Sequence, residues 1–134
     1  MREIKFRAWD KNTNTMYENI SILPSMECIA INVDYDHDFQ EYCIDESYVV
    51  ELKDVELLEY TGLKDKNGVE IYEGDIVETT RALNHIIGIV TMIKGCWYIQ
   101  DGEDSYYRLI PRFGKVENKV IGNIYENKEL LEED

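Results

Sequence analysis

The segment that most resembles a metal-binding loop reads DKNG at residues 65–68. With Gly68 at the sixth position of a calcium loop, Asp65 and Asn67 supply oxygen ligands at the third and fifth positions. Leu63 then stands at the first position and Gly74 at the twelfth, where such a loop needs carboxylates. Because both anchoring ligands are missing, the segment predicts a turn and no calcium site.

Thiol and imidazole groups, which zinc prefers, are spread along the chain without a closely spaced pair. A nucleophilic Cys28 or Cys96 would need His85 beside it in space, which no local pattern indicates. The strong enzymatic signatures, namely a P-loop, G-x-S-x-G and H-E-x-x-H, do not occur. We therefore expect no metal and no cofactor. The side chains considered as zinc ligands are Cys28, His37, Cys43, His85 and Cys96.

Asp75 and His85, with neighbouring acids, are the residues best suited to acid–base chemistry. An enzyme built on them requires a concave pocket with at least two such groups within hydrogen-bond reach. We expect that the chain is not an enzyme, because it contains no complete catalytic set. An enzyme with a site near Asp75 and His85 is the alternative hypothesis.

Aromatic residues and one arginine gather on two adjacent predicted strands, at 96–100 and 106–110. SH3-like barrels present such side chains as a groove for peptides. If alternate residues face outward, Tyr98 and Tyr107 with Arg108 line a partner-binding surface. The competing interpretation is a barrel core with scattered surface tyrosines.

The chain carries 28 acidic and 14 basic residues, a formal net charge of −14. Such a surface repels a phosphate backbone, so direct nucleic-acid binding is disfavoured. It suits a basic protein partner or a nucleic-acid mimic, and it also suits a surface that is acidic only for solubility. We expect a protein as partner, with homo-oligomer formation as a further option because open strand edges can pair.

The chain is organised around the stretch from Tyr60 to Val77, YTGLKDKNGVEIYEGDIV, in which three glycines stand six residues apart. Asn67-Gly68 readily supplies two consecutive positive φ angles and predicts the tip of a tight turn. Gly74-Asp75 predicts a second bend, which starts a strand at Ile76. We therefore assign structural roles to Gly62, Asn67, Gly68, Gly74 and Asp75.

Alternation of apolar and polar residues predicts short strands before this stretch. The first seventeen residues predict a β-hairpin, and its basic residues Arg2, Lys5 and Arg7 predict a solvated strand face or an anion contact. Further strands are expected at 20–23, 27–33, 48–51 and 55–60. Residues 34–47 contain no clean period, and their conformation is left open.

Five strands are expected after Gly74, at 76–80, 85–93, 96–100, 106–110 and 119–125. This pattern predicts a partly open SH3-like barrel, with the oligonucleotide-binding barrel as a competitor. Gly88 predicts a bend or bulge, and Asn127 predicts the cap of a short helical tail, 128–134. The expected organisation is an N-terminal β-rich subdomain over 1–60, a turn segment over 61–75 and the barrel over 76–134.

The compartment is expected to be the cytoplasm. Three cysteines without a C-x-x-C pair suit a reducing environment. The N-terminus MREIKFRAWD places charges where a secretory signal needs an apolar core. No apolar run reaches the roughly 18 residues of a membrane helix.

Three motifs together resemble the YopX-like family of phage and prophage proteins from low-GC bacteria. They are IKFRAWD at 4–10, YTGLKDKNG-x-EIYEGDIV at 60–77, and VIGNIYEN-x-ELL at 120–131. The resemblance runs from the first residues to the last, although about 21–56 contains no matching motif. It implies a phage-encoded or prophage-encoded cytoplasmic protein with a mainly β fold, so the expected protein partner is a host or phage protein. It implies no activity, and therefore no catalytic residues.

Overall fold

The computed structural model describes residues 4–31, 35–36, 41–42, 49–81, 84–110 and 116–131. The fold is mainly β, as predicted, and its described helical segments are short 3-10 turns. None of the described helical segments is long and apolar enough to cross a membrane. The chain divides into two compact units, Lys5–Leu58 and the chain from Glu59 onward, and each is described by itself.

The Lys5–Leu58 unit begins with the predicted hairpin, in which β1 (Phe6–Asp10) pairs with β2 (Thr15–Tyr17). Asp10 fixes the turn by accepting the backbone N–H groups of Asn12 and Thr13. Burial alone would raise the pKa of Asp10, but these N–H groups and the hydroxyls of Thr13 and Tyr17 hold it below its ordinary value.

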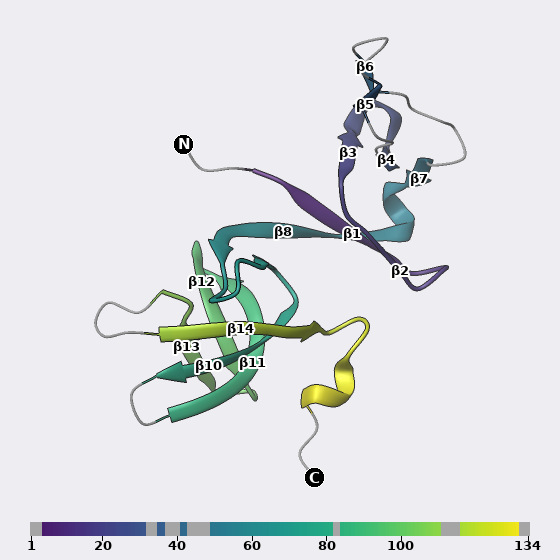
Figure 1. Ribbon diagram of the computed structural model, residues 1–134. Helices are drawn as coiled ribbons and strands as arrows, with labels where there is room; N and C mark the ends of the chain where they lie inside the picture. Colours follow the sequence, from purple (N-terminus) through teal and green to yellow (C-terminus); the bar gives the residue numbers. More distant parts are fainter. Residues whose placement is uncertain are drawn as a thin grey trace. The chain divides into compact units, whose positions relative to one another are not determined.

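A second sheet of the same unit has the order β3-β4-β7, and a two-stranded ladder lies between β4 and β7 in sequence (Figure 1). The strands predicted at 20–23, 27–33 and 48–51 are confirmed with slightly different ends. Of the segment 34–47, only the ladder β5–β6 lies within the described residues. The elements are β3 (Ile20–Leu23), η1 (Pro24–Met26), β4 (Cys28–Ile31), β5 (Tyr35–Asp36), β6 (Glu41–Tyr42), β7 (Val49–Glu51) and η3 (Leu52–Asp54).

The expectation of a solvated basic face on the first strand is wrong for Arg7, which is only 7% exposed. The strand β1 is central in the order β2-β1-β8-β9, and its residues Arg7 to Asp10 are all buried. Ala8 belongs to the core of this unit with Ile29 and Val55. Both faces of β1 are therefore covered, so alternation does not separate an inside from an outside here. Lys5 is half-buried, and Arg2 lies outside the described residues.

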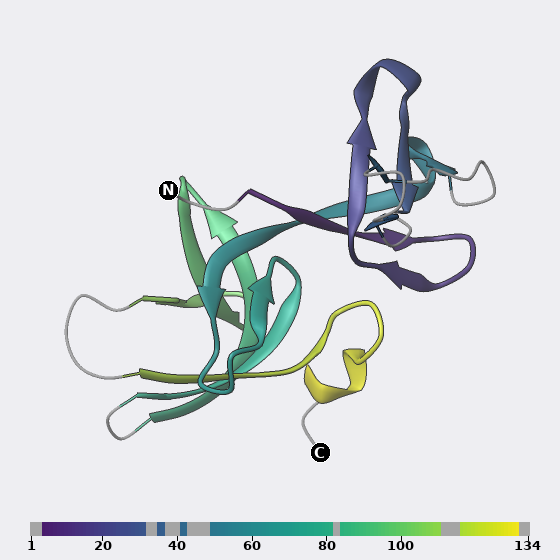
Figure 2. The same cartoon turned by 45° about the horizontal axis from the view of Figure 1, so that its top comes forward.

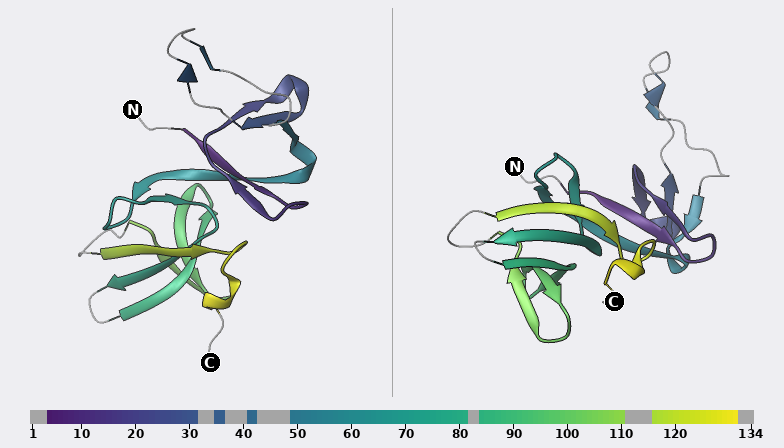
Figure 3. Two further views of the ribbon diagram at one scale, coloured as in Figure 1. Left: turned by 45° about the vertical axis from the view of Figure 1, so that its right-hand side comes forward. Right: turned by 60° about the horizontal axis from the view of Figure 1, so that its bottom comes forward.

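The unit from Glu59 onward contains a five-stranded antiparallel sheet with the order β13-β12-β11-β10-β14. The sheet curls into a half-barrel, and Figure 3 shows β12 and β13 turning away from the layer of β14, β10 and β11. Its core is built from Ile71, Val77, Val90, Ile99 and Leu109. The five predicted strands are confirmed as β10 (Asp75–Arg81), β11 (Asn84–Ile93), β12 (Cys96–Asp101), β13 (Ser105–Arg108) and β14 (Val116–Asn123).

The C-terminal tail forms one 3-10 turn, η4 (Lys128–Leu131), within the described residues. Its first bond runs from the N–H of Leu130 to the carbonyl of Asn127. The side chain of Asn127 does not make the expected cap on the tail. It turns back and accepts the N–H of Asn123 at 3.2 Å, so it closes the turn that ends β14.

The glycine-spaced stretch contains the two predicted turns, but the strand before it does not end at Tyr60, and a further strand lies between the turns. The strand β8 (Val55–Lys64) continues past Tyr60, and β9 (Glu70–Tyr72) pairs back onto it. The ladder is irregular between Tyr60 and Lys64, where Gly62 has a φ of 87°. Gly62 therefore supplies a bulge that lets one strand continue through a point where its regular pairing is interrupted.

The turn between β8 and β9 is set by Asp65, and the predicted double positive φ at Asn67-Gly68 is wrong. Only Gly68 has a positive φ there, 83°, and its N–H donates to the carbonyl of Asp65. The Asp65 carboxylate accepts the N–H groups of Asn67 at 2.8 Å and Val69 at 2.9 Å. These bonds stabilise a turn with a single left-handed residue at its end. Two consecutive positive φ angles occur instead at Lys94-Gly95, between β11 and β12.

Asp65 also fastens this turn to β14. Figure 2 shows that the loop after β8 reaches β14. Its second oxygen, Oδ2, accepts the N–H of Val120 at 2.9 Å, and the N–H of Lys66 donates to the carbonyl of Asn118. These two bonds satisfy backbone groups at the edge of β14, where no neighbouring strand does so. Burial alone would raise the pKa of Asp65, but the N–H groups of Val120, Val69 and Asn67 and the charge of Lys119 hold it below its ordinary value.

Gly74 and Asp75 form the second joint and start β10, as predicted. Gly74 has a φ of 85°, its N–H donates to the carbonyl of Val90, and its carbonyl accepts from Ile124. Asp75 is 1% exposed and accepts the N–H of Tyr72 at 2.8 Å. The two residues therefore connect β9, β10, β11 and the end of β14 at one point.

Gly88 does not mark a bulge, because it pairs with Val77 in an uninterrupted part of the β10–β11 ladder. The register shift of this sheet lies between Ile76 and Val77 on the β14 side. A Cβ added at Gly88 would lie 2.5 Å from the carbonyl oxygen of Gln100 and 2.7 Å from Ile99. Glycine is required here by close approach of the neighbouring strand.

The surroundings of Gly68 and Gly88 predict different losses of the free energy of unfolding when each is replaced by alanine. Gly68→Ala places Cβ in open space but in a left-handed conformation, so the free energy of unfolding should fall by about 1 kcal/mol. Gly88→Ala drives Cβ into backbone and should cost about 3 kcal/mol. Urea unfolding followed by tryptophan fluorescence measures both variants. Equal losses at the two positions would contradict this account.

Replacing the Asp65 carboxylate should weaken the structure in a pH-dependent way. Asp65→Asn loses a charged acceptor of three N–H groups and should cost about 2 kcal/mol near neutral pH. Because the folded-state pKa is lowered, the carboxylate stabilises the fold above the ordinary pKa of aspartate, about 4, and this contribution is lost as pH falls through the folded-state value.

Urea unfolding of wild type and variant at decreasing pH tests this sign, and the difference between them should shrink in acid. Asp104→Asn, at the exposed tip of the β12–β13 hairpin, is the matched control and should change stability by less than about 0.5 kcal/mol. A difference that stays constant down to strongly acidic pH would rule out the ionised carboxylate as its cause.

Candidate functional site

The outward face of β12 and β13 brings together two of the three residues predicted to bind a partner. Tyr98 lies directly opposite Arg108 in the antiparallel ladder, so the two side chains share one face of the sheet. Gln100 lies opposite Tyr106 on the same face. Tyr106 is 44% exposed, which leaves a large aromatic ring available for contact.

Tyr107 lies on the other face of the sheet from Tyr98 and Arg108. It is paired with Ile99, which is fully buried, and adjacent residues of a strand point to opposite sides. Its ring lies 6.0 Å from the guanidinium carbon of Arg81. The structure therefore places Tyr107 in a contact inside the half-barrel and not on the predicted surface.

Arg81 connects β10 with the end strand β13, which is not its neighbour in the sheet. From β10 its side chain donates to the backbone carbonyl of Arg108 on β13, and its Nε donates to Thr79 at 3.3 Å. Burial lowers the pKa of the Arg81 guanidinium below its ordinary value, and the nearby Tyr107 partly opposes this. No local pattern in the sequence indicated a bond between residues 81 and 108.

Asp75 and His85 do not come together. His85 lies opposite Thr80, five positions along β10 from Asp75, a separation of about 17 Å along the strand. Asp75 is buried and bonded to Tyr72, whereas the His85 side chain is 57% exposed and lies 3.1 Å from Glu78. The hydrogen bond from His85 lowers the pKa of Glu78. This pair lies on an open sheet surface.

Within the part of the chain that the structure describes, no cluster of three metal-ligating side chains occurs. Cys28 is buried in the Lys5–Leu58 unit, while Cys96 is exposed in the unit from Glu59 onward. Cys96 stands beside Trp97 at the start of β12 and is not a core residue. His37 and Cys43, considered as ligands, lie outside the described residues.

Two neighbouring hollows lie where the half-barrel is open, and they share a wall made of Leu63, Leu109 and Ile110. The first has a volume of about 260 Å³ and is also lined by Lys64, Ile71, Val116 and Asn118. The second has a volume of about 180 Å³ and is also lined by Cys96, Trp97 and Arg108. We call the two together the Leu63 groove. Sequence patterns did not indicate it, because its lining comes from five separate segments.

A larger hollow, of about 530 Å³, lies on the Lys5–Leu58 unit beside Met26, Glu27, Glu51, Leu52 and Lys53. Its charged lining side chains are exposed, and Lys53 pairs with Glu51 at 3.1 Å. None of these described side chains contains a buried polar atom without a partner. We therefore place the candidate site in the other unit, at the Leu63 groove and the outward face of β12 and β13.

Solved structures with the same fold are known. The crystal structure of protein EF1440 from Enterococcus faecalis is 30% identical, with a TM-score of 0.66, over 98% of this chain and 100% of that one. The crystal structure of protein yopX from Bacillus subtilis is 22% identical, with a TM-score of 0.60, and shares the fold over 98% of this chain and 100% of its own. No curated protein matches the sequence.

The family model of the YopX protein matches residues 5–132. This range contains both compact units, the glycine-spaced stretch and the candidate site. The resemblance read from the three sequence motifs is thereby confirmed. The chain belongs to the YopX protein family.

Proposed function

We propose that this chain is a non-enzymatic protein-binding module, encoded by a phage or prophage and acting in the cytoplasm of the bacterial host. The observation that carries the proposal is the outward face of β12 and β13, where Tyr98 and Arg108 are direct cross-strand neighbours and Tyr106 is exposed beside them. Tyrosine and arginine are the residue types that most often dominate binding energy at protein interfaces.

The geometry favours binding over catalysis. A catalytic site needs titratable groups that converge on one reacting atom, and Asp75 and His85 are separated along β10. The outward face offers instead two phenol groups, an amide and a guanidinium on a rigid sheet. Such a set gives hydrogen bonds and stacking to a partner at low entropic cost.

The proposed surface is tested with the double variant Tyr98→Ala/Tyr106→Ala. Wild-type chain coupled to a resin should recover a saturable protein partner from host lysate, and the variant should bind that purified partner at least tenfold more weakly. Biolayer interferometry measures the affinities, and circular dichroism checks the fold. Thr80→Ala/Lys94→Ala, at exposed positions elsewhere on the sheet, is the matched control and should bind as wild type does.

Equal binding by both variants would refute the surface, and recovery of no saturable partner would refute the function. Light scattering at several concentrations identifies a second copy of the chain as the partner. A salt-sensitive complex with duplex DNA would contradict the proposal directly, because a surface of net charge −14 should repel the duplex. Competition with DNA for a DNA-binding protein would favour nucleic-acid mimicry.

A further inference from the structure

The dipeptide Asn67-Gly68, at the turn between β8 and β9, contains the groups required for spontaneous deamidation. An asparagine loses its side-chain amide when the backbone nitrogen of the next residue attacks its Cγ and closes a five-membered succinimide ring. Glycine in the second position favours this attack, because it has no Cβ to hinder the nitrogen and its backbone is unusually free. Asn67 is the only asparagine of the chain that precedes a glycine.

The turn leaves room for this reaction. Asn67 and Gly68 are both exposed, so water and hydroxide reach them. A Cβ built on Gly68 would meet no atom within 4 Å, so a ring that forms at this residue clashes with nothing. Space and solvent therefore do not protect the dipeptide, and any protection must come from the hydrogen bonds of the turn.

Asp65 provides these hydrogen bonds on both sides of the attacking nitrogen. The nitrogen must lose its proton before it attacks, yet the N–H of Gly68 donates to the carbonyl of Asp65 at 3.0 Å. The Asp65 carboxylate accepts the N–H groups of the two neighbouring residues, Asn67 at 2.8 Å and Val69 at 2.9 Å. The nitrogen is therefore released only when these bonds open, and this local opening costs free energy.

We propose that Asn67 is a modification site, at which deamidation proceeds through local opening of the turn that Asp65 holds. In the open turn, hydroxide removes the amide proton of Gly68 and the nitrogen forms a bond to Cγ of Asn67. The bond from Cγ to the side-chain nitrogen breaks, and this nitrogen takes a proton from water and leaves as ammonia. A water molecule then adds to one of the two ring carbonyls and opens the succinimide. Addition at Cγ gives aspartate, and addition at the backbone carbonyl gives isoaspartate.

The two products differ in their effect on β14. Aspartate adds one negative charge and keeps the backbone, so Asp65 retains its geometry toward Val69 and Val120. Isoaspartate adds one carbon to the backbone between Asp65 and Val69, and this displaces the Val69 N–H from the carboxylate. The other oxygen of the same carboxylate accepts the N–H of Val120, so isoaspartate should loosen the edge of β14.

The test is incubation of the folded full chain at mildly alkaline pH in water enriched in heavy oxygen, followed by digestion in ordinary water and mass spectrometry. Residue 67 should lose its amide and gain heavy oxygen, at a rate that rises with pH. The hydrogen-bonded side chains of Asn118, Asn123 and Asn127 should stay intact over the same time. Wild type unfolded in urea should react at residue 67 at least about tenfold faster, because it lacks the turn.

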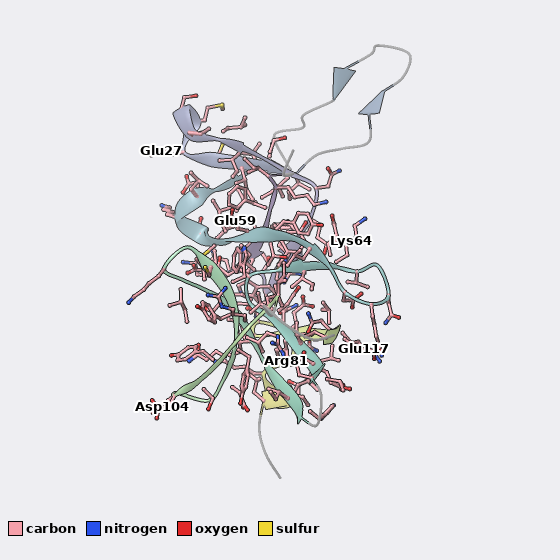
Figure 4. All side chains as sticks on the ribbon, turned by 90° about the vertical axis from the view of Figure 1, so that its left-hand side faces the viewer. Glu27, Glu59, Lys64, Arg81, Asp104 and Glu117 are labelled. Carbon is pink, nitrogen blue, oxygen red and sulfur yellow. The ribbon has the colours of Figure 1, made fainter. Side chains whose placement is uncertain are left out.

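Two variants isolate the part played by Asp65. Asp65→Asn weakens the acceptor of three N–H groups and should speed the reaction at residue 67 at least about threefold. Asp104→Asn is the matched control and should leave this rate unchanged. Figure 4 shows Asp104 on the opposite side of this unit from Lys64, the last residue of β8. The unfolded wild type keeps the test informative if Asp65→Asn does not fold.

The effect on β14 is measured on the separated products. Ion exchange isolates the deamidated chains, which carry one further negative charge, and the isoaspartate form is then compared with the variant Asn67→Asp. Both have the same charge, but only the variant has a normal backbone. Hydrogen exchange of the Val120 N–H, followed by nuclear magnetic resonance, should be at least about threefold faster in the isoaspartate form.

Three results would overturn the inference. An intact Asn67 after a time in which a blocked Lys-Asn-Gly-Val peptide deamidates completely, and many times over, would remove the modification site. Equal rates in the folded and the unfolded chain would show that the turn does not restrain the reaction. Equal exchange of the Val120 N–H in the isoaspartate form and in Asn67→Asp would remove the effect on β14. The reaction needs no partner protein, so the inference goes beyond the proposed function and fails or holds independently of it.

Discussion

The carboxylate of Asp65 takes the place of a strand beside β14. One oxygen organises the turn between β8 and β9, and the other accepts the N–H of Val120, a residue 55 positions away. Without this group the edge of β14 would present unpaired backbone, and the glycine-spaced stretch would have no fixed place against the sheet. The glycine-spaced stretch thus supports the half-barrel.

The other end of the curled sheet is closed by a side chain as well. Arg81 reaches from β10 to the carbonyl of Arg108, so β13 and β14 are each fastened by a charged residue and not by a continuous ladder. Such closure leaves gaps between the fastened points, and the Leu63 groove is one of them.

Local patterns predicted most strands, because alternation and turn residues act over a few positions. The Asn67-Gly68 dipeptide predicted the wrong backbone angles, because the side chain of Asp65, two residues earlier, determines the turn. Side chains alternate between the two faces of a strand, and this alternation already separates Tyr107 from Arg108. The register places Tyr98 on the face of Arg108. No local pattern indicates that the buried Trp97 Nε1 and Asn118 Oδ1 have no hydrogen-bond partner among the described residues, because this depends on packing between distant segments.

The position of β14 beside β10 has a consequence for synthesis on the ribosome. The strands β10 to β13 are joined by local hairpins, but β10 must wait for the last strand to emerge before its second edge is paired. A nascent chain that ends before residue 116 therefore presents the buried strand Ile76–Thr79 as an open edge, a template for association with another chain. The acidic character of the sequence offsets this hazard, since growing chains of like charge repel one another.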